Sequence, residues 1–406
     1  MTEGLKAGWR RVRFGDVVKL NLETSKDPAA DGLDRYVGLE HLEPGDLRIR
    51  SWGEIADGTT FTNRFRPGQV LFGKRRAYQR KVALADFDGI CSGDIYVLES
   101  RDPNLLLPEL LPFICQTDGF FEHAVATSAG SLSPRTNWTS LAEYKLRLPP
   151  LDEQARIIRP LRATDTTVSA LRDTIDTLDR TETASLIELM SVNALAGRAP
   201  SLENSTSSIR TTPLMPMRNV SDCIVPGRKK PRFASKPHTS DVLPWVTIPD
   251  ISGTVIGNDT PAARIAIKEL ASCGARIVPP GTVLIACIRA IGLVAITQVA
   301  VSFNQQLHAF QADRRYLRPD YLVYALRAQK RQMLSRAAET LVPYLNKENC
   351  ESIIIPVPKL HVQDEIANFY DQFEQCRGDL TRRLANTLLV RSILIDDTIA
   401  PEVDSG

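Results

Sequence analysis

The chain contains 406 residues, with 50 Lys and Arg against 48 Asp and Glu, so its formal net charge at pH 7 is +2. This length suggests two or three domains of about 100–200 residues each, and the near-neutral charge neither favours nor excludes nucleic acid, because charge acts locally within roughly 8–10 Å. Seven cysteines without a Cys-x-x-Cys pair argue against a disulfide scaffold and against a zinc cluster.

Residues 1–149 are expected to form a first globule of mixed α+β structure. Short apolar runs between Gly and Pro residues, such as Val70–Phe72 and Ile95–Leu98, predict strands, and Leu105–Gln116 predicts a helix. The first residues lack the apolar segment of a signal peptide, and no stretch approaches the ~18 uninterrupted apolar residues of a membrane helix. We therefore expect a soluble, cytoplasmic protein.

Positive charge in this globule gathers in residues 64–81, which contain seven bases and no acid. Lys and Arg neutralise phosphates, and Arg, Gln and Asn can make paired hydrogen bonds to base edges. The ordinary alternative is a solvated basic loop. Gly68–Lys74 has the spelling of a phosphate-binding loop, but Arg75 stands where Ser or Thr would hold magnesium, so a nucleotide site is not expected.

A long helix is predicted after Pro149 and Pro150, because proline is tolerated at a helix start but not in the helix interior. From Ile157 to Leu178, apolar residues recur at the spacing of a coiled-coil seam. Residues 150–197 are expected to form this first helical spacer. Residues 198–213, which are rich in Ser, Thr and Pro, are expected to form a flexible linker.

Residues 214–358 are expected to form a second α+β globule, with strands such as Val283–Ile285 and a helix at Tyr321–Ala337. Its basic stretch, residues 227–236, contains five bases and no acid. The basic loop of the first globule follows a Pro-Gly pair. Arg289 follows a second Pro-Gly pair at about the same distance along the chain. This correspondence favours a function for both loops.

A second helical spacer is predicted at residues 359–400, because its apolar residues again follow a heptad seam, and residues 401–406 form a tail. The two halves are copies of one pattern. Five residues around the first helix start have counterparts of the same or similar type around the second, at an offset of 209 residues: Leu148, Pro149, Leu151, Gln154 and Ile157 match Val357, Pro358, Leu360, Gln363 and Ile366. Such a shared offset indicates an internal repeat.

The predicted fold class is therefore α+β, with two α/β globules joined by two long antiparallel coiled-coil helices in a pseudo-twofold internal repeat. The helices would hold the globules at opposite ends. No catalytic chemistry is predicted, because the chain lacks the His-Glu-x-x-His, Gly-x-Ser-x-Gly and Rossmann glycine motifs, and its five histidines are dispersed. It also lacks the Asn/Asp-Pro-Pro-Tyr/Phe motif of amino-methyltransferases. We expect no catalytic residue, no metal and no cofactor bound by this chain.

The sequence resembles the DNA specificity (S) subunit of type I restriction–modification systems over nearly its whole length. The resemblance is carried by Pro149–Ile157, by the opening Trp9–Val17, by Asn304–Gln306 and by Leu341–Asn346. It implies that each globule is a target-recognition domain that reads one half of a bipartite double-stranded DNA target. One departure from the family pattern is Val362, which stands where the family has Glu.

The resemblance also implies partners for the chain. The helices would set the gap between the half-sites and dock two methyltransferase (modification) subunits, which would bring S-adenosylmethionine and methylate adenine in phage defence. Restriction or translocase subunits would be optional further partners. Residues implied to mark the docking helices are Glu153, Gln154, Ile157, Gln363 and Ile366.

The candidate DNA-binding residues come from the basic loops and from one glutamine pair. They are Lys74, Arg75, Arg76, Tyr78, Gln79, Arg80, Lys81, Arg228, Lys229, Lys230, Arg232, Arg289, Gln305 and Gln306. Three alternatives stay open at this point. The chain could be a stand-alone enzyme on DNA, a coiled-coil DNA-binding scaffold or regulator, or a specificity subunit of another phage-defence methylation system.

Overall fold

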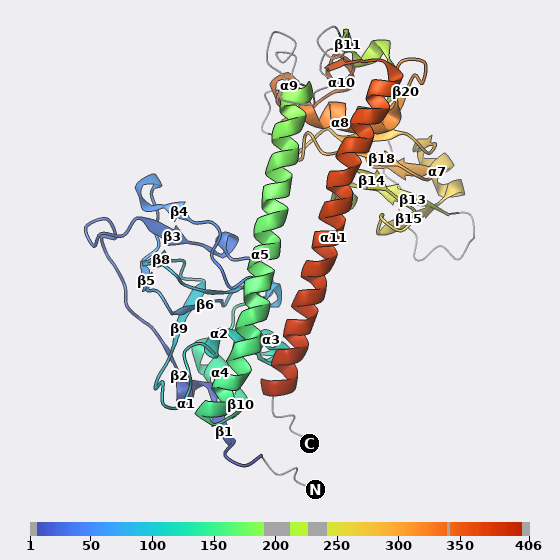
Figure 1. The fold of residues 1–406 in the computed structure, drawn as a ribbon. Coiled ribbons are helices and arrows are strands. Elements are labelled where there is room, and N and C mark those ends of the chain that lie inside the picture. The colour runs from blue at the N-terminus through green and yellow to red at the C-terminus, as the bar shows by residue number, and fades with distance from the viewer. Residues whose placement is uncertain (1–5, 191–211, 226–241, 339–341, 400–406) are drawn as a thin grey trace. The chain divides into compact units, whose positions relative to one another are not determined.

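The computed structural model describes residues 6–190, 212–225, 242–338 and 342–399 (Figure 1). The chain divides into two compact units. The first unit contains Met1–Ile175 and Leu380–Gly406, and the second contains Asp176–Asp379. Each unit therefore combines one globule with parts of both long helices, and each is described by itself below.

The described strands of the first unit, coloured blue and cyan in Figure 1, form three small sheets. An antiparallel pair joins its ends: β1 (Arg10–Arg13) and β10 (Lys145–Leu148). The second sheet has the order β2 (Val18–Leu20), β9 (Ile95–Ser100), β6 (Val70–Gly73), β7 (Val82–Leu84). The third has the order β4 (Gly53–Glu54), β3 (Arg35–Val37), β8 (Gly89–Cys91), β5 (Asn63–Phe65). Among the described strands of this unit, β3 and β8 pair in parallel and the other pairs are antiparallel.

Short helices complete the first unit: α1 (Phe14–Val17), α2 (Leu111–Ile114), α3 (Asp118–Ala126) and α4 (Trp138–Ala142). Aromatic side chains of α1, β6 and α3 fill the core between them, since Phe14, Phe72 and Phe120 are fully buried. The predicted helix Leu105–Gln116 is wrong in extent, because only the four residues of α2 are helical. Pro108 and Pro112 lack the backbone N–H that a continuous helix needs.

The second unit repeats the three sheets of the first. Its end pair is β11 (Leu214–Pro216) with β21 (Ile354–Pro356). Its second sheet has the order β12 (Ser221–Ile224), β20 (Leu307–Ala312), β17 (Val283–Ala286), β18 (Val294–Thr297), β14 (Val255–Ile256). Its third has the order β15 (Ala263–Ala266), β13 (Val242–Val246), β19 (Val301–Phe303), β16 (Ile277–Val278). The strand β14 is an addition, and β13 pairs with β19 in parallel as β3 does with β8.

The helices of the second unit are α7 (Ile267–Cys273), α8 (Pro319–Ala328), α9 (Lys330–Arg336) and α10 (Lys347–Glu351). The predicted helix Tyr321–Ala337 is divided into α8 and α9 at Gln329, whose ψ of 17° interrupts the α-helical backbone. Short 3₁₀ turns are present in both units. In the first unit they are Leu39–His41, Ile55–Asp57 and Ala77–Gln79, and in the second they are Met217–Asn219 and Ile248–Asp250. The matching strand orders confirm the internal repeat.

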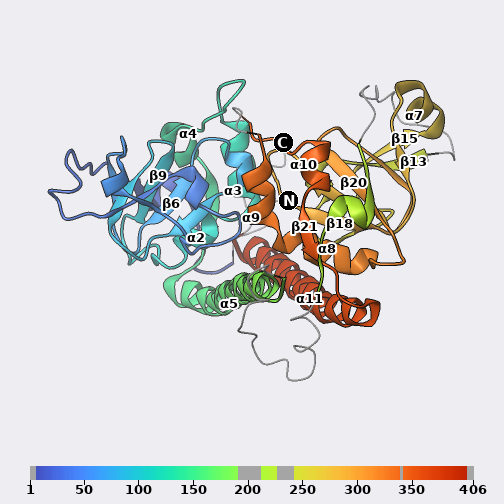
Figure 2. The same ribbon diagram turned by 90° about the horizontal axis from the view of Figure 1, so that it is seen from above.

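Two helices of 40 residues each, α5 (Leu151–Met190) and α11 (Leu360–Ile399), contribute to both units. In the first unit Arg391 donates to Asp165 over 3.0 Å. In the second unit Arg377 donates to Asp179 over 2.6 Å, and the hydroxyls of Ser185 and Tyr370 are 3.0 Å apart. Within the second unit, positions rise along α5 as they fall along α11, so the two helix segments are antiparallel, as predicted, and they lie side by side (Figures 1 and 2). No helix among the described residues is long and apolar enough to span a membrane.

Candidate nucleic-acid interface

The turn between β6 and β7, residues 74–81, has an unusual backbone. It is built around the 3₁₀ turn Ala77–Gln79, and the residues on either side of it, Arg76 and Arg80, have φ values of 54° and 55°. A side chain in this left-handed region costs roughly 1–2 kcal/mol. Backbone bonds hold the conformation, because Arg76 N donates to Pro134 O over 2.7 Å and Thr136 N donates to Lys74 O over 3.0 Å.

The matching turn of the second unit, residues 287–293 between β17 and β18, has the same feature. Arg289 has a φ of 62° and lies 213 positions after Arg76. The anchoring is also repeated, since Leu345 N donates to Cys287 O over 2.9 Å. Among the described residues, Arg76, Arg80 and Arg289 are the non-glycine residues with positive φ. Backbone strain of this kind concentrates at functional sites, so the two turns are candidate recognition loops.

The predicted DNA-binding cations of the first loop differ in their partners. Arg75 donates to Asp94 over 3.1 Å, Arg80 pairs with Asp118, and Lys81 donates to Leu39 O over 2.6 Å. These three cations therefore already form intramolecular hydrogen bonds or ion pairs. Only Tyr78 is strongly exposed in this loop, at 57%, and Gln79 is half-buried beside it.

Lys74 and Arg76 form no ion pair within the described part of the chain. The Lys74 ammonium lies 4.6 Å from the ring centroid of Tyr96, and Arg76 donates to Ser133 Oγ over 3.2 Å. The Nε atom of Arg76 is buried without a hydrogen-bond partner. A guanidinium without a carboxylate partner is suited to binding a phosphate or a base edge through its terminal nitrogens.

A further cation, Arg135, joins this group and was missed by the sequence analysis. It forms a β-bridge with Arg75, and its Nε donates to Asp94 over 2.7 Å. Its place could have been found from the repeat, because Pro134 beside it matches Pro343 at the common offset of 209. Partial burial raises the pKa of Asp94, but the hydrogen bonds from Arg135 and Arg75 outweigh burial and hold that pKa below its usual value.

We expect Asp94→Asn to destabilise the first unit at neutral pH. A lowered native pKa contributes stability above the unfolded value of about 3.9 and loses it as the pH falls through the native pKa. The difference in unfolding free energy between wild type and variant should therefore be constant above about pH 5 and shrink below about pH 4. Denaturant unfolding at stepped pH measures it. A difference that persists at about pH 2 would show that the loss is steric and not ionic.

The second loop carries fewer charges. Arg289 is exposed and forms no ion pair within the described residues. Gln306 O accepts from Cys287 N over 2.9 Å, which brings the turn with exposed Gln305 beside this loop. Gln306 occupies the place of Asp94, since Lys74 N donates to Asp94 O over 3.0 Å in the first unit. The candidates Arg228, Lys229, Lys230 and Arg232 lie outside the described residues.

The residues predicted to mark the docking helices lie at the two helix starts. Gln154 and Gln363 are 0% exposed, and each binds three backbone groups of its own unit. Ile157 and Ile366 are also buried, while Glu153 accepts from Trp9 Nε1 over 2.9 Å. In this conformation the two glutamine side chains fix the helix starts and are not available to a partner.

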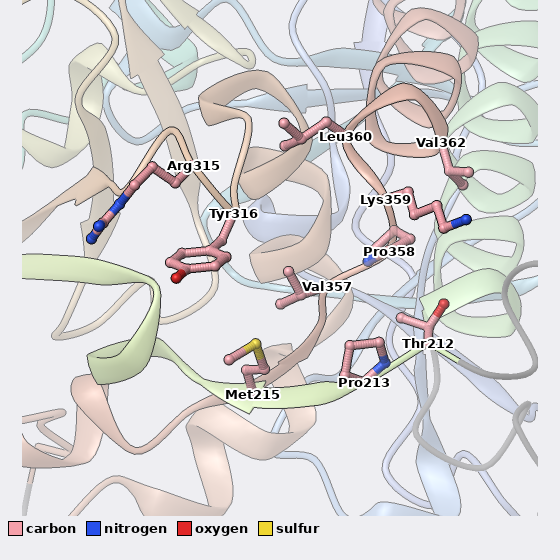
Figure 3. Close-up of a pocket in the computed structure, with 10 residues that line it drawn as sticks. All are labelled: Thr212, Pro213, Met215, Arg315, Tyr316, Val357, Pro358, Lys359, Leu360 and Val362. Atoms are coloured by element: carbon pink, nitrogen blue, oxygen red, sulfur yellow. The ribbon is translucent and has the colours of Figure 1, made fainter.

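A pocket of about 380 Å³ lies beside the start of α11 in the second unit (Figure 3). Met215, Tyr316 and Val357 give it an apolar lining, and Arg315 and Lys359 add positive charge. Exposed Lys359 lies one residue before α11 and four before buried Gln363. The surface around this helix start therefore offers both apolar area and cations.

Two sequence comparisons place this architecture among known proteins. Residues 6–180 and 223–389 match the family described as the type I restriction modification DNA specificity domain. Over 161 residues, 37% of this chain, the sequence is 32% identical to the type I restriction enzyme EcoDI specificity subunit of Escherichia coli. The match covers 33% of the length of that subunit.

Solved structures with similar folds cover nearly the whole chain. A chain of a type I R-M system, described for its complex assembly and conformational transition, matches with a TM-score of 0.52 at 23% identity, over 97% of this chain and 98% of that one. The type I restriction–modification S subunit from M. genitalium matches with a TM-score of 0.57 at 12% identity, over 99% of each chain. At these identities the likeness concerns the fold alone, and it agrees with two globules joined by two helices.

Proposed function

Because the chain belongs to the family of type I restriction–modification DNA specificity subunits, we propose that each of its two units reads one half of a bipartite double-stranded DNA target. The observation that carries this proposal is the pair of recognition loops. Each unit presents an arginine that forms no ion pair with any residue the structure describes, Arg76 or Arg289, at the same position of the repeated fold and with the same left-handed backbone. The loops differ in their other side chains, so the two half-sites would differ in sequence.

The chain would contribute recognition and no catalysis. In this proposal two methyltransferase subunits dock on α5 and α11 and supply S-adenosylmethionine for adenine methylation, and restriction or translocase subunits can join them. The surface beside the start of α11, with Lys359 and the pocket next to it, suits an apolar and acidic partner surface. The antiparallel helices are continuous over 40 residues each, which suits a spacer of fixed length.

Co-expression with a methyltransferase subunit encoded beside this chain, followed by mapping of methylated adenines in the host genome, tests the proposal. The expected result is one bipartite motif with a fixed gap, and no methylation when either chain is expressed alone. The purified chain incubated with S-adenosylmethionine and DNA is the matched control. Methyl transfer by this chain alone, or a stable complex without any motif, would contradict the proposal.

A further inference from the structure

Two thiols and one imidazole meet in the core of the second unit. Cys287 follows β17, His308 lies in β20 and Cys350 lies in α10. Cys287 and Cys350 are fully buried and His308 is 2% exposed. The Sγ atoms of Cys287 and Cys350 are 3.9 Å apart, and Cys350 Sγ is 3.6 Å from His308 Nδ1. One potential ligand atom from each residue lies within 4.8 Å of the others.

The two separations that involve Cys350 Sγ, 3.9 and 3.6 Å, are close to the edges of a tetrahedral metal site. With metal–sulfur bonds of ≈ 2.3 Å and metal–nitrogen bonds of ≈ 2.0–2.1 Å, neighbouring donor atoms of a tetrahedron lie roughly 3.5–3.8 Å apart. Two thiolates, one neutral imidazole and one divalent cation sum to zero charge, so the loaded site could stay buried without an unpaired charge. Besides their contacts within the group, the two thiols make long contacts to carbonyl oxygens, 3.6 Å from Cys287 Sγ to Ile285 O and 3.8 Å from Cys350 Sγ to Leu345 O.

The surroundings of His308 suit a ligand that binds through Nδ1. Its other ring nitrogen, Nε2, lies 3.3 Å from the hydroxyl of Tyr344. A histidine that coordinates through one nitrogen commonly donates from the other to an oxygen, which fixes the ring. Tyr344 precedes Leu345, whose N–H binds Cys287 O, so the same segment holds both the imidazole and the backbone of the first thiol.

The first unit provides an internal comparison. Tyr96 pairs with Phe72 across β9 and β6 in the first unit, as His308 pairs with Ile285 across β20 and β17 in the second. Tyr96 therefore occupies the place of His308. Lys74 and Leu141 occupy the places of Cys287 and Cys350, at offsets of 213 and 209. Lys74 packs its ammonium over the ring of Tyr96, so the fold fills these positions without any thiol. Within the described part of the chain, this group of three potential ligands occurs in the second unit and its counterpart positions in the first unit hold Lys74, Tyr96 and Leu141.

A fourth thiol, Cys223, belongs to the same core but not to the group of three whose ligand atoms lie within 4.8 Å of one another. Cys223 pairs with Phe310 across β12 and β20, and side chains two residues apart on a strand share a face. Cys223 therefore lies on the same face of the sheet as His308, and it belongs to the same core cluster as Cys287 and Cys350.

We propose that Cys287, His308 and Cys350 form a buried site for a thiophilic divalent cation of the zinc class, with Cys223 or a water as fourth ligand. The ion would tie the base of the Arg289 loop, which begins at Cys287, to β20 and α10. The sequence analysis argued against a zinc cluster because the seven cysteines include no Cys-x-x-Cys pair. These three ligands come from separated segments, and only the tertiary fold brings them together.

Metal analysis of the full chain, purified without chelator, tests this proposal without DNA or partners, so its outcome is separate from that of the proposed function. We expect about one zinc-class ion per chain, and after exchange for cobalt(II) a thiolate-to-metal charge-transfer absorption. The informative variants copy the first unit: Cys350→Leu and His308→Tyr each insert the residue that the repeat already accommodates. Each should cut the bound metal at least tenfold, and loss in Cys223→Ser as well would identify the fourth ligand.

Two cysteine variants outside the cluster are matched controls. Cys91→Ala removes a buried thiol of the first unit and Cys376→Ala removes an exposed one, and both should keep the metal. Circular dichroism establishes which variants fold, and cobalt titration of the wild-type chain needs no variant at all. Folded wild-type protein that shows no metal and no cobalt absorption, a Cys287–Cys350 disulfide in its place, or full metal content in folded Cys350→Leu would each overturn the proposal.

Discussion

Replacing Arg289 with alanine is expected to weaken recognition of one half of the DNA target by about 5- to 150-fold and to leave the other half unaffected, and Arg76→Ala should do the reverse. The range follows from the roughly 1–3 kcal/mol that one paired arginine–base contact contributes to discrimination, at 1.4 kcal/mol per tenfold change. Each arginine is exposed or partly exposed and forms no ion pair within the described residues, so its removal leaves no stranded carboxylate.

The backbone of these loops makes two further variants informative. Glycine adopts a positive φ without strain, so Arg76→Gly removes the guanidinium while it relieves the backbone, whereas Arg76→Lys keeps the charge but loses the planar fork. If the guanidinium reads a base, the glycine and lysine variants should both relax the sequence preference of one half-site. If Arg76 binds only phosphate, Lys should restore binding and Gly should lower the salt slope by about one.

Binding to a library of DNA duplexes, read by sequencing of the bound fraction at several salt concentrations, measures both quantities. Lys19→Ala is a control, because Lys19 lies in β2 and pairs with Glu99 over 3.0 Å. Loss of preference in both half-sites from a single variant, or no change in any variant, would contradict the assignment of one loop to each half-site.

The sequence was sufficient for the repeat, the positions of many strands and both long helices, because these depend on local apolar spacing and on proline at the helix starts. It was insufficient for the charge of the recognition loops. Residues 64–81 contain no acid, yet Arg66, Arg75 and Arg80 are paired with Glu23, Asp94 and Asp118. Those partners come from other strands and helices, so a count along the chain overestimates the free positive charge.

The left-handed arginines were equally beyond prediction from sequence. Arginine has no preference for positive φ, and nothing in Lys74–Lys81 or Cys287–Leu293 marks Arg76 or Arg289. Their conformation is imposed by long-range backbone bonds to Pro134 and by the repeat of that anchoring in the second unit. The burial of Gln154 and Gln363 was also beyond prediction from sequence. Their shared offset is visible in the chain, but their burial depends on hydrogen bonds to loops that precede them by more than 40 residues.

Gln154→Ala and Gln363→Ala are expected to destabilise the first and the second unit, respectively, by about 3–5 kcal/mol, because each unmet buried backbone group costs roughly 1–3 kcal/mol. In the first unit Leu107 N donates to Gln154 Oε1 over 2.9 Å, and Gln154 Nε2 donates to Leu105 O and Pro149 O over 2.8 and 2.9 Å. Gln363 makes the same three bonds with Arg318 N, Tyr316 O and Pro358 O, at 2.7, 2.8 and 2.7 Å. Each glutamine therefore ties the first turn of a long helix to its own globule.

The two losses can be measured separately, because Trp9, Trp52 and Trp138 lie in the first unit and Trp245 in the second. Denaturant unfolding followed by fluorescence in a Trp245→Phe background reports the first unit, and a background with only Trp245 reports the second. Gln375→Ala, an exposed glutamine on α11, should change either transition by no more than about 0.5 kcal/mol. A loss confined to the unit that carries the substituted glutamine indicates that each globule is fastened to its helix independently. Equal losses in both transitions would instead mean that the two units unfold as one cooperative body, and no loss would remove the glutamines from the set of residues that fix the helix starts.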